Sequence, residues 1–129
     1  MAKNNPLFHI VHCSDSEHGD AALIRKWHME APRHWDNIGY HFVIRKDGGI
    51  EIGRPLAQSG AHCAGFNTRS VGTCIIGKPG KPNAAQLSSL KGIHEKLKRM
   101  FPNIEACGHR DMPNVTKECP GFNVKDYLK

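Results

Sequence analysis

Short apolar runs of strand length alternate along this chain with two longer stretches of helical periodicity, and this alternation limits the folds that the chain can adopt. The strand-like runs are rich in β-branched and aromatic residues and cover residues 7–13, 40–45, 50–53, 71–76 and 104–107. The helical stretches follow Asp20 and Asn83, whose side chains can cap a first turn. Pro32 is expected to end the first of them, and Trp27 to lie in the core. Strands that alternate with helices predict an α/β domain.

A tight turn between two of the predicted strands decides the arrangement of the sheet. Lys46-Asp47-Gly48-Gly49 separates residues 40–45 from residues 50–53 and is typical of a β-hairpin. With the interleaved helices, this hairpin predicts a mixed central β-sheet flanked by helices, and residues 123–128 are expected to form a short terminal helix. A chain of 129 residues has room for one core, so residues 1–129 are expected to form a single domain with a short N-terminal arm at residues 1–7.

Cysteine use and hydropathy exclude several classes of protein. The sequence contains no apolar run long enough for a membrane span and no secretion signal, so we expect no membrane insertion and synthesis in the cytoplasm. Five cysteines are an odd number, and none forms a CxxC pair. A disulfide framework is therefore not expected, and each thiol is either a small buried group or a chemically active one.

The net charge of +6 comes from the second half of the chain. Residues 65–129 carry 11 basic and 5 acidic groups, whereas residues 1–64 carry 7 of each sign. A positive face suits a polyanionic partner such as nucleic acid, anionic lipid or bacterial cell wall, and the alternative is an ordinary solvated helix surface. Because aromatic residues make up only 7% and no nucleic-acid-binding motif is present, no specific nucleic-acid partner is expected.

Three side chains of the metal-ligand type fall where predicted strands end or loops begin. His12 lies near the end of the first strand, His109 follows the last strand, and Cys119 precedes a proline. Two imidazoles and one thiolate could hold zinc and leave a fourth tetrahedral position open, which is the arrangement of catalytic rather than structural zinc. Packed histidines and a buried thiol are the alternative, and the spacing of the three residues does not decide between them.

A set of short motifs runs along the chain in a fixed order. They are Val11-His12-Cys13-Ser14, Gly39-Tyr40-His41-Phe42, Asp47-Gly48, Gly53-Arg54, Gly60-Ala61-His62, Asn67, Gly72-Thr73-Cys74, Gly108-His109-Arg110-Asp111 and Lys117-Glu118-Cys119-Pro120. The set resembles the type 2 N-acetylmuramoyl-L-alanine amidases, within the superfamily of zinc amidases and peptidoglycan recognition proteins. It is most similar to the compact phage endolysins traditionally called lysozymes. The resemblance covers about residues 8–128, and its specificity lies in the joint order of the motifs.

The resemblance implies roles for individual residues of this chain. His12, His109 and Cys119 match the three zinc ligands of the family, so one Zn²⁺ per chain is expected. Tyr40 matches the tyrosine that orients the attacking water, and Lys117 matches the residue that stabilises the developing oxyanion. Without the resemblance, Tyr40 would be read as an aromatic strand residue and Lys117 as a solvated loop lysine.

The resemblance also implies a substrate and partners. Family members cleave the amide between the lactyl group of N-acetylmuramic acid and the first L-alanine of the peptidoglycan stem peptide. His62 matches a histidine at the edge of the substrate groove, and Asn67 and Arg69 are carried over as stem-peptide contacts. A phage member would be made in the host cytoplasm and reach the cell wall through a separate pore. Some phage relatives also bind the phage RNA polymerase. The arm before Phe8 is short in this chain, which argues against that second role, so it is not predicted here.

Two other functions are compatible with the same residues. The first is a metal-free hydrolase in which Cys119 is the nucleophile and His109 its base. The second is a non-catalytic module that recognises peptidoglycan, which is the fate of family members that lose a zinc ligand. The presence of all three candidate ligands disfavours the second alternative.

Overall fold

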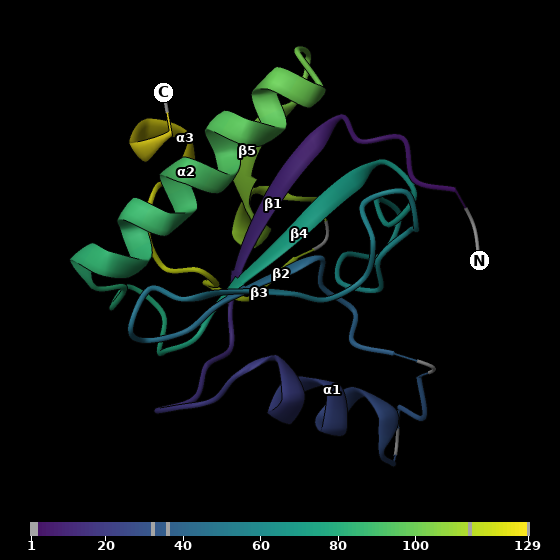
Figure 1. Ribbon diagram of the computed structural model, residues 1–129, viewed down its shortest axis with the longest axis vertical. Coiled ribbons are helices and arrows are strands. Elements are labelled where there is room, and N and C mark those ends of the chain that lie inside the picture. Colours follow the sequence, from purple (N-terminus) through teal and green to yellow (C-terminus); the bar gives the residue numbers. More distant parts are fainter. Residues whose placement is uncertain (1–2, 32, 36, 114, 129) are drawn as a thin grey trace.

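Five strands form one sheet in the order β3-β2-β4-β1-β5 (Figure 1). The computed structural model describes residues 3–31, 33–35, 37–113 and 115–128. The strands are β1 (Phe8–Cys13), β2 (Phe42–Ile44), β3 (Ile50–Ile52), β4 (Ser70–Ile75) and β5 (Glu105–Gly108). The helices are α1 (Ala21–Met29), α2 (Ala84–Met100) and α3 (Val124–Tyr127), and a 3₁₀ turn, η1 (His109–Asp111), follows β5.

The sheet is mixed, as the sequence predicts. β1 pairs in parallel with β4 and β5, and β2 pairs in parallel with β4, whereas β2 and β3 form an antiparallel hairpin. In the hairpin turn the Asp47 carboxylate accepts a hydrogen bond of 2.8 Å from the backbone N–H of Gly49. Gly48 has a φ of 85°, which glycine adopts without strain. The predicted α/β fold is therefore confirmed.

Both long helices begin at the predicted caps. The Asp20 carboxylate accepts a hydrogen bond of 2.8 Å from the backbone N–H of Leu23 at the start of α1. At the start of α2, Asn83 and Gln86 form a reciprocal capping box. α1 ends at Met29, and Pro32 lies outside the described residues.

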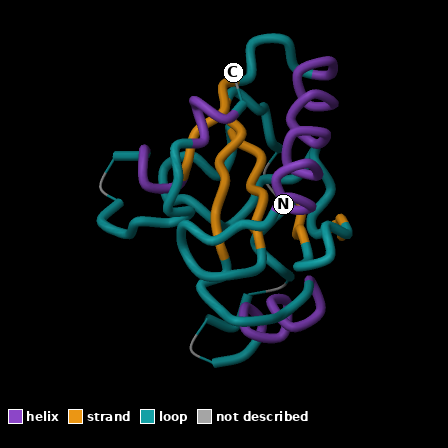
Figure 2. The backbone as a smooth tube through the Cα atoms, turned by 90° about the vertical axis from the view of Figure 1, so that its left-hand side faces the viewer, coloured by secondary structure: helices purple, strands orange, loops and turns teal. Residues whose placement is uncertain are grey.

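Different helices cover the two faces of the sheet (Figures 1 and 2). α2 packs Leu90, Ile93 and Leu97 into the larger core cluster on one face. α1 packs Ala21 and Ile24 against buried residues of β2 and β4 on the other face. β1 and β4 are buried on both faces of the sheet, and buried polar side chains on them, such as His9 and Thr73, are hydrogen-bonded there.

Side chains of β1 alternate between these two faces. Val11 lies in the core beneath α2, and His9 points the same way, because its Nδ1 lies 3.1 Å from Nδ1 of His94 on that helix. The other ring nitrogen of His9 lies 2.8 Å from the hydroxyl of Thr73. His12 faces the opposite side and lines a pocket there.

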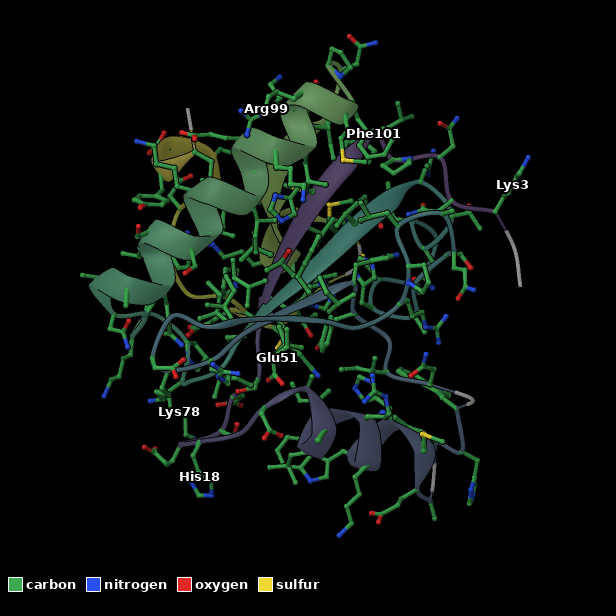
Figure 3. All side chains as sticks on the ribbon, viewed as in Figure 1. Lys3, His18, Glu51, Lys78, Arg99 and Phe101 are labelled. Atoms are coloured by element: carbon green, nitrogen blue, oxygen red, sulfur yellow. The ribbon has the colours of Figure 1, made fainter. Side chains whose placement is uncertain are left out.

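Part of the excess positive charge lies on the exposed side of α2. Lys91, Lys96, Lys98 and Arg99 are all exposed, and Figure 3 shows Arg99 on the outer side of this helix. Because α2 covers the face opposite the pocket, its basic surface is separate from the pocket residues. Within the described ranges, no helix has the length and apolar character needed to cross a membrane.

Candidate metal centre and active site

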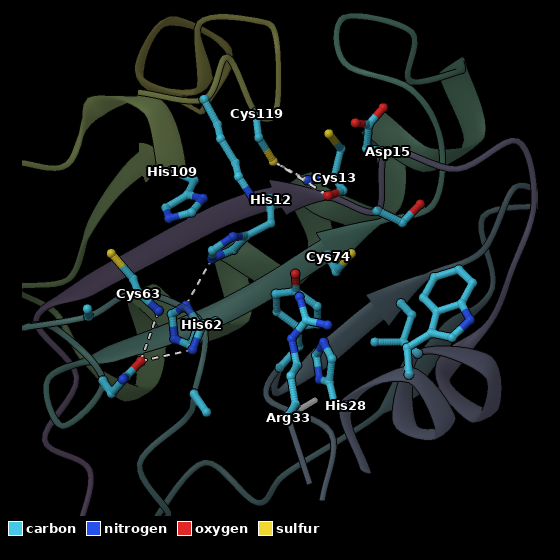
Figure 4. A pocket seen from close by; sticks show the side chains of 18 of the residues that line it. His12, Cys13, Asp15, His28, Arg33, His62, Cys63, Cys74, His109 and Cys119 are labelled. Carbon is cyan, nitrogen blue, oxygen red and sulfur yellow. Dashed lines mark hydrogen bonds between the residues drawn. The ribbon is translucent and has the colours of Figure 1, made fainter. Parts of the chain in front are cut away.

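The carboxyl ends of the parallel strands β1 and β5 open into a pocket of about 760 Å³ (Figure 4). Ligand sites of open α/β sheets are commonly found at this end of the strands. The pocket is lined by residues 12–15 at and after the end of β1, by three side chains of α1, by Arg33, Trp35 and Tyr40, by residues 61–64 with Asn67, and by His109 with residues 117–119. The loop before β4 therefore borders the pocket with residues 61–64 and Asn67.

His12, His109 and Cys119 meet in this pocket although they are far apart in the sequence. His109 opens η1 directly after β5, and Cys119 precedes a cis peptide bond to Pro120. One ligand atom from each residue can be chosen so that all three atoms lie within 4.8 Å of one another. A tetrahedral zinc with Zn–N of about 2.0–2.1 Å and Zn–S of about 2.3 Å keeps its ligand atoms about 3.3–3.8 Å apart. A small inward movement of the side chains would satisfy that geometry.

A chain of hydrogen bonds determines which nitrogen of His12 is available to a metal. The hydroxyl of Ser70 donates its only proton to the carbonyl of Phe66 at 2.7 Å, so it accepts from Nε2–H of His62 at 3.1 Å. In a neutral ring, Nδ1 of His62 is then an acceptor, and Nε2 of His12 donates to it at 2.9 Å. His12 therefore keeps the lone pair of Nδ1 for a metal, with His62 holding its other nitrogen.

The protonation states of the three residues fit a zinc site. Burial and the nearby His62 and His109 lower the pKa of His12 well below its usual range. Burial, with a contribution from Lys117, also lowers the pKa of His109. Both imidazoles are thus neutral at pH 7, as metal ligands must be. A hydrogen bond with the side chain of Cys13 and burial raise the pKa of Cys119, so a bound cation is needed to stabilise its thiolate.

Tyr40 lies two residues before β2, which begins at Phe42, and so precedes the strand that it was expected to open. Its ring lies 5.0 Å from the ring of His12 and lines the pocket. Burial and the neighbouring thiols of Cys74 and Cys119 raise the pKa of Tyr40 well above its usual range. The hydroxyl stays protonated at neutral pH and can therefore donate a hydrogen bond to a substrate or to water.

Lys117 lines the pocket from the same segment as Cys119. Its side chain is exposed, and its positive charge is one of the causes, after burial, of the lowered pKa of His109. A flexible ammonium in this position can approach an oxygen atom that is held next to the metal ligands. The oxyanion role of Lys117 stays a prediction, and the structure provides the position from which it could act.

The three predicted substrate contacts are placed differently. His62 and Asn67 line the pocket, whereas Arg69 is not among the lining residues, and its guanidinium lies 4.4 Å from the centre of the Phe66 ring. The amide oxygen of Asn67 accepts hydrogen bonds of 2.9 Å from the backbone N–H groups of His62 and Cys63. Asn67 therefore orders the loop that carries His62. Direct contact of these residues with a substrate stays a prediction.

The wall formed by α1 and the residues after it contains groups that the sequence analysis missed. Trp27 is 38% exposed and lines the pocket, so the expectation that it lies in the core is wrong. α1 instead buries Ile24 and His28 on its inner side, and a histidine carries no apolar signal in a periodicity pattern. Arg33 and Trp35 line the same wall.

Comparison with known proteins identifies the family of the chain. The N-acetylmuramoyl-L-alanine amidase family pattern matches residues 2–122. The chain is 36% identical over 130 residues to the endolysin of Enterobacteria phage K11, covering 93% of this chain and 83% of that protein. The amidase LysC from Clostridium intestinale URNW has a similar structure, with a TM-score of 0.84 and 32% identity over 93% of this chain and 79% of its own. Drosophila PGRP-LB aligns with a TM-score of 0.83 and 26% identity over 98% and 81% of the two chains.

These matches span nearly the whole chain and include both the strands and the segments that carry the three ligand-type residues. The chain belongs to the N-acetylmuramoyl-L-alanine amidase family. Phage endolysins and peptidoglycan recognition proteins are among its relatives, as the motif order predicts.

Proposed function

We propose that this protein is a zinc-dependent peptidoglycan hydrolase that cleaves the amide between N-acetylmuramic acid and the L-alanine of the stem peptide. One observation carries the proposal: His12, His109 and Cys119 converge in a pocket of a chain that belongs to the amidase family. The relatives named endolysins support a role in the lysis of a host cell wall. For such a role the protein would be made in the host cytoplasm and reach the wall through a separate pore.

Different residues have different roles in the proposed amide hydrolysis. Bound by His12, His109 and Cys119, zinc would supply Lewis-acid chemistry that polarises a carbonyl and activates water at neutral pH. The protonated hydroxyl of Tyr40 orients the attacking water by donating or accepting a hydrogen bond. The ammonium of Lys117 stabilises the negative charge that develops on the carbonyl oxygen.

A metal-free Cys/His hydrolase is less well supported. A nucleophilic cysteine needs a lowered pKa and a histidine base within hydrogen-bond distance. Instead, the pKa of Cys119 is raised, and its sulfur accepts a hydrogen bond of 2.7 Å from the backbone N–H of Cys13. No hydrogen bond joins Cys119 to His109 in the described part of the chain. A non-catalytic recognition module remains the second alternative, and the complete ligand set argues against it.

Mass spectrometry of digested sacculi tests the proposal directly. The expected products are muramic acid residues with a free lactyl carboxylate and peptides that begin with L-alanine. EDTA should abolish the digestion and Zn²⁺ should restore it, with the Cys119→Ser variant as the inactive control. Cleavage within the sugar chain or the peptide would contradict the proposal, and full activity after removal of all metal would favour the thiol hydrolase.

A further inference from the structure

Cys13 is a thiol beside the candidate metal centre, and the proposed chemistry gives it no role. It is the last residue of β1 and directly follows His12. Its sulfur does not belong to the group of ligand atoms within 4.8 Å of one another, which comes from His12, His109 and Cys119. Cys13 nevertheless lines the same pocket as these three residues. Zinc binding therefore does not account for a second thiol at this position.

The backbone and the side chain of Cys13 both contact the sulfur of Cys119. The backbone N–H of Cys13 donates a hydrogen bond of 2.7 Å to Sγ of Cys119, and the same sulfur lies 3.5 Å from the carbonyl oxygen of Cys13. A hydrogen bond also joins the two thiols. Figure 4 shows Sγ of Cys119 directed at Cys13, with dashed lines along the two backbone contacts. The two thiols are therefore neighbours although they lie 106 positions apart in the sequence.

This arrangement meets the distance requirement of a disulfide. Cα of Cys13 is one bond of about 1.46 Å from the nitrogen that contacts Sγ of Cys119, and Cα of Cys119 is two bonds from that sulfur. Because these segments are not collinear, the two Cα atoms lie less than about 7 Å apart, and disulfides join Cα atoms about 4.4–6.8 Å apart. Rotation of the two side chains can therefore bring the sulfur atoms together without a large movement of the backbone.

The other three cysteines are placed differently. Cys63 and Cys107 belong to a separate core cluster, where the thiol of Cys107 lies 3.5 Å from the sulfur of Met112. Cys74 is fully buried in β4, and its side chain is hydrogen-bonded to Tyr40. Within the described residues, the pair at the end of β1 is thus the one in which a hydrogen bond joins two thiols.

A disulfide at this position would compete with zinc for the same sulfur. Zinc binds cysteine as a thiolate, and a sulfur that is bonded to another sulfur can no longer supply one. Conversely, a thiolate that is bound to zinc is withdrawn from thiol–disulfide exchange. Each of the two states would join the end of β1 to the segment after β5, but only the reduced state offers the complete ligand set.

We propose that Cys13 and Cys119 form a reversible disulfide when zinc is absent, and that this bond prevents zinc from binding until it is reduced. The inference rests on the proposed role of Cys119 as a zinc ligand. A low-molecular-weight disulfide such as glutathione disulfide is the oxidant. Its reaction with the two thiols of the protein takes place in two exchange steps.

The two exchange steps balance in atoms and electrons. The thiolate of one cysteine attacks glutathione disulfide, which forms a mixed disulfide and releases one glutathione thiolate. The thiolate of the other cysteine then attacks the protein sulfur of the mixed disulfide and releases the second glutathione. The two protein thiols lose two electrons and two protons in total, and glutathione disulfide takes up both to become two molecules of glutathione.

Peptide mapping after treatment with glutathione disulfide tests the inference. The zinc-free protein should lose about 2 Da, the mass of two hydrogen atoms, and should yield a peptide pair linked through Cys13 and Cys119. The zinc-loaded protein should not form this link under the same treatment. The oxidised protein should bind no stoichiometric zinc in competition with a chelator, and a phosphine reductant should restore binding.

Two variants separate this pair from the other thiols. Cys13→Ala should form no such link, and when reduced it should bind zinc as tightly as the parent protein. After treatment with glutathione disulfide it should still bind zinc. Cys63→Ala, which removes another cysteine that lines the pocket, is the matched control and should behave like the parent protein.

The inference would be overturned if the zinc-free parent protein yields no Cys13–Cys119 link. It would also be overturned if the link forms equally fast with zinc bound, or if the linked protein binds zinc. Failure of the proposed function looks different: the reduced, zinc-loaded protein would then leave sacculi intact, while the peptide map and the zinc measurement, which require no activity, still decide the inference. A reduced protein that binds no zinc would reject both.

Discussion

Nε2 of His12 lies 2.9 Å from Nδ1 of His62, and this contact links the candidate metal centre to the loop that borders the substrate pocket. Since the hydroxyl of Ser70 holds the other nitrogen of His62, the position of the His12 ring depends on both β4 and the 61–67 loop. His62, which the resemblance placed at the edge of the groove, therefore also orients a proposed zinc ligand.

Replacing His62 by alanine should weaken zinc binding without removing a ligand. The expected loss of affinity is about 10- to 100-fold, because His12 would no longer be held in one tautomer and orientation. Competition with a chelator of known affinity measures the change. His18→Ala, at an exposed histidine, is the matched control. Unchanged affinity in His62→Ala would show that the contact does not support the metal.

Removal of zinc should lower thermal stability, because the proposed metal joins β1 to the segment after β5. At a free zinc concentration one hundred times its Kd, the expected stabilisation is about 2.7 kcal/mol. Thermal unfolding with Zn²⁺ and with EDTA measures it. Cys119→Ser should melt at the same temperature under both conditions. If the melting temperature of the parent protein is also the same with Zn²⁺ and with EDTA, zinc does not join β1 to the segment after β5.

Lys117→Ala should retain zinc and lose activity. Removal of one group that stabilises an oxyanion typically costs about 100-fold or more in kcat. Steady-state kinetics, together with zinc analysis of the same sample, separates lost catalysis from lost metal. Lys96→Ala on the exposed side of α2 should leave the rate unchanged. Normal turnover of Lys117→Ala would show that Lys117 does not stabilise the oxyanion.

The buried His9 should make the protein less stable as the pH falls. Burial and the neighbouring His94 lower the pKa of His9 from 6.5 to about 3. Between these values the unfolded chain binds a proton that the folded chain excludes, so the contribution of neutral His9 is complete above about pH 6.5 and decreases toward pH 3.

Urea unfolding between pH 4 and 7 tests this pH dependence. In His9→Gln, the slope of the unfolding free energy against pH should be flatter by about 1.4 kcal/mol per pH unit, which corresponds to one proton. His18→Gln, at an exposed histidine, should keep the slope of the parent protein. An identical slope in His9→Gln would show that His9 titrates alike in the folded and unfolded chains.

The elements of the fold were predictable because their signals are local. Asp20 and Asn83 mark the helix starts by capping chemistry that acts within one turn, and Asp47-Gly48 marks the hairpin. Trp27 was wrongly predicted to lie in the core, because helical periodicity identifies buried positions only by their apolar residues. His28 takes the buried position on α1 and satisfies its ring nitrogen with the backbone of Gly39.

The candidate site was predictable only through the order of its motifs. The intervals between His12, His109 and Cys119 contain no geometric information, and their convergence depends on the parallel pairing of β1 with β5. The contact of His12 with His62 depends on how one loop lies over a strand, which no local signal describes.

The alternation of side chains along β1 has a consequence for genetic engineering. β1 supplies His9 to the packed interior and His12, three positions later, to the candidate metal centre, on opposite faces of the same sheet. Insertion or deletion of a single codon between them would turn one of these imidazoles toward the wrong side. Insertions and deletions should therefore avoid β1. Point substitutions at positions of β1 other than His9 and His12 leave the alternation of its side chains unchanged.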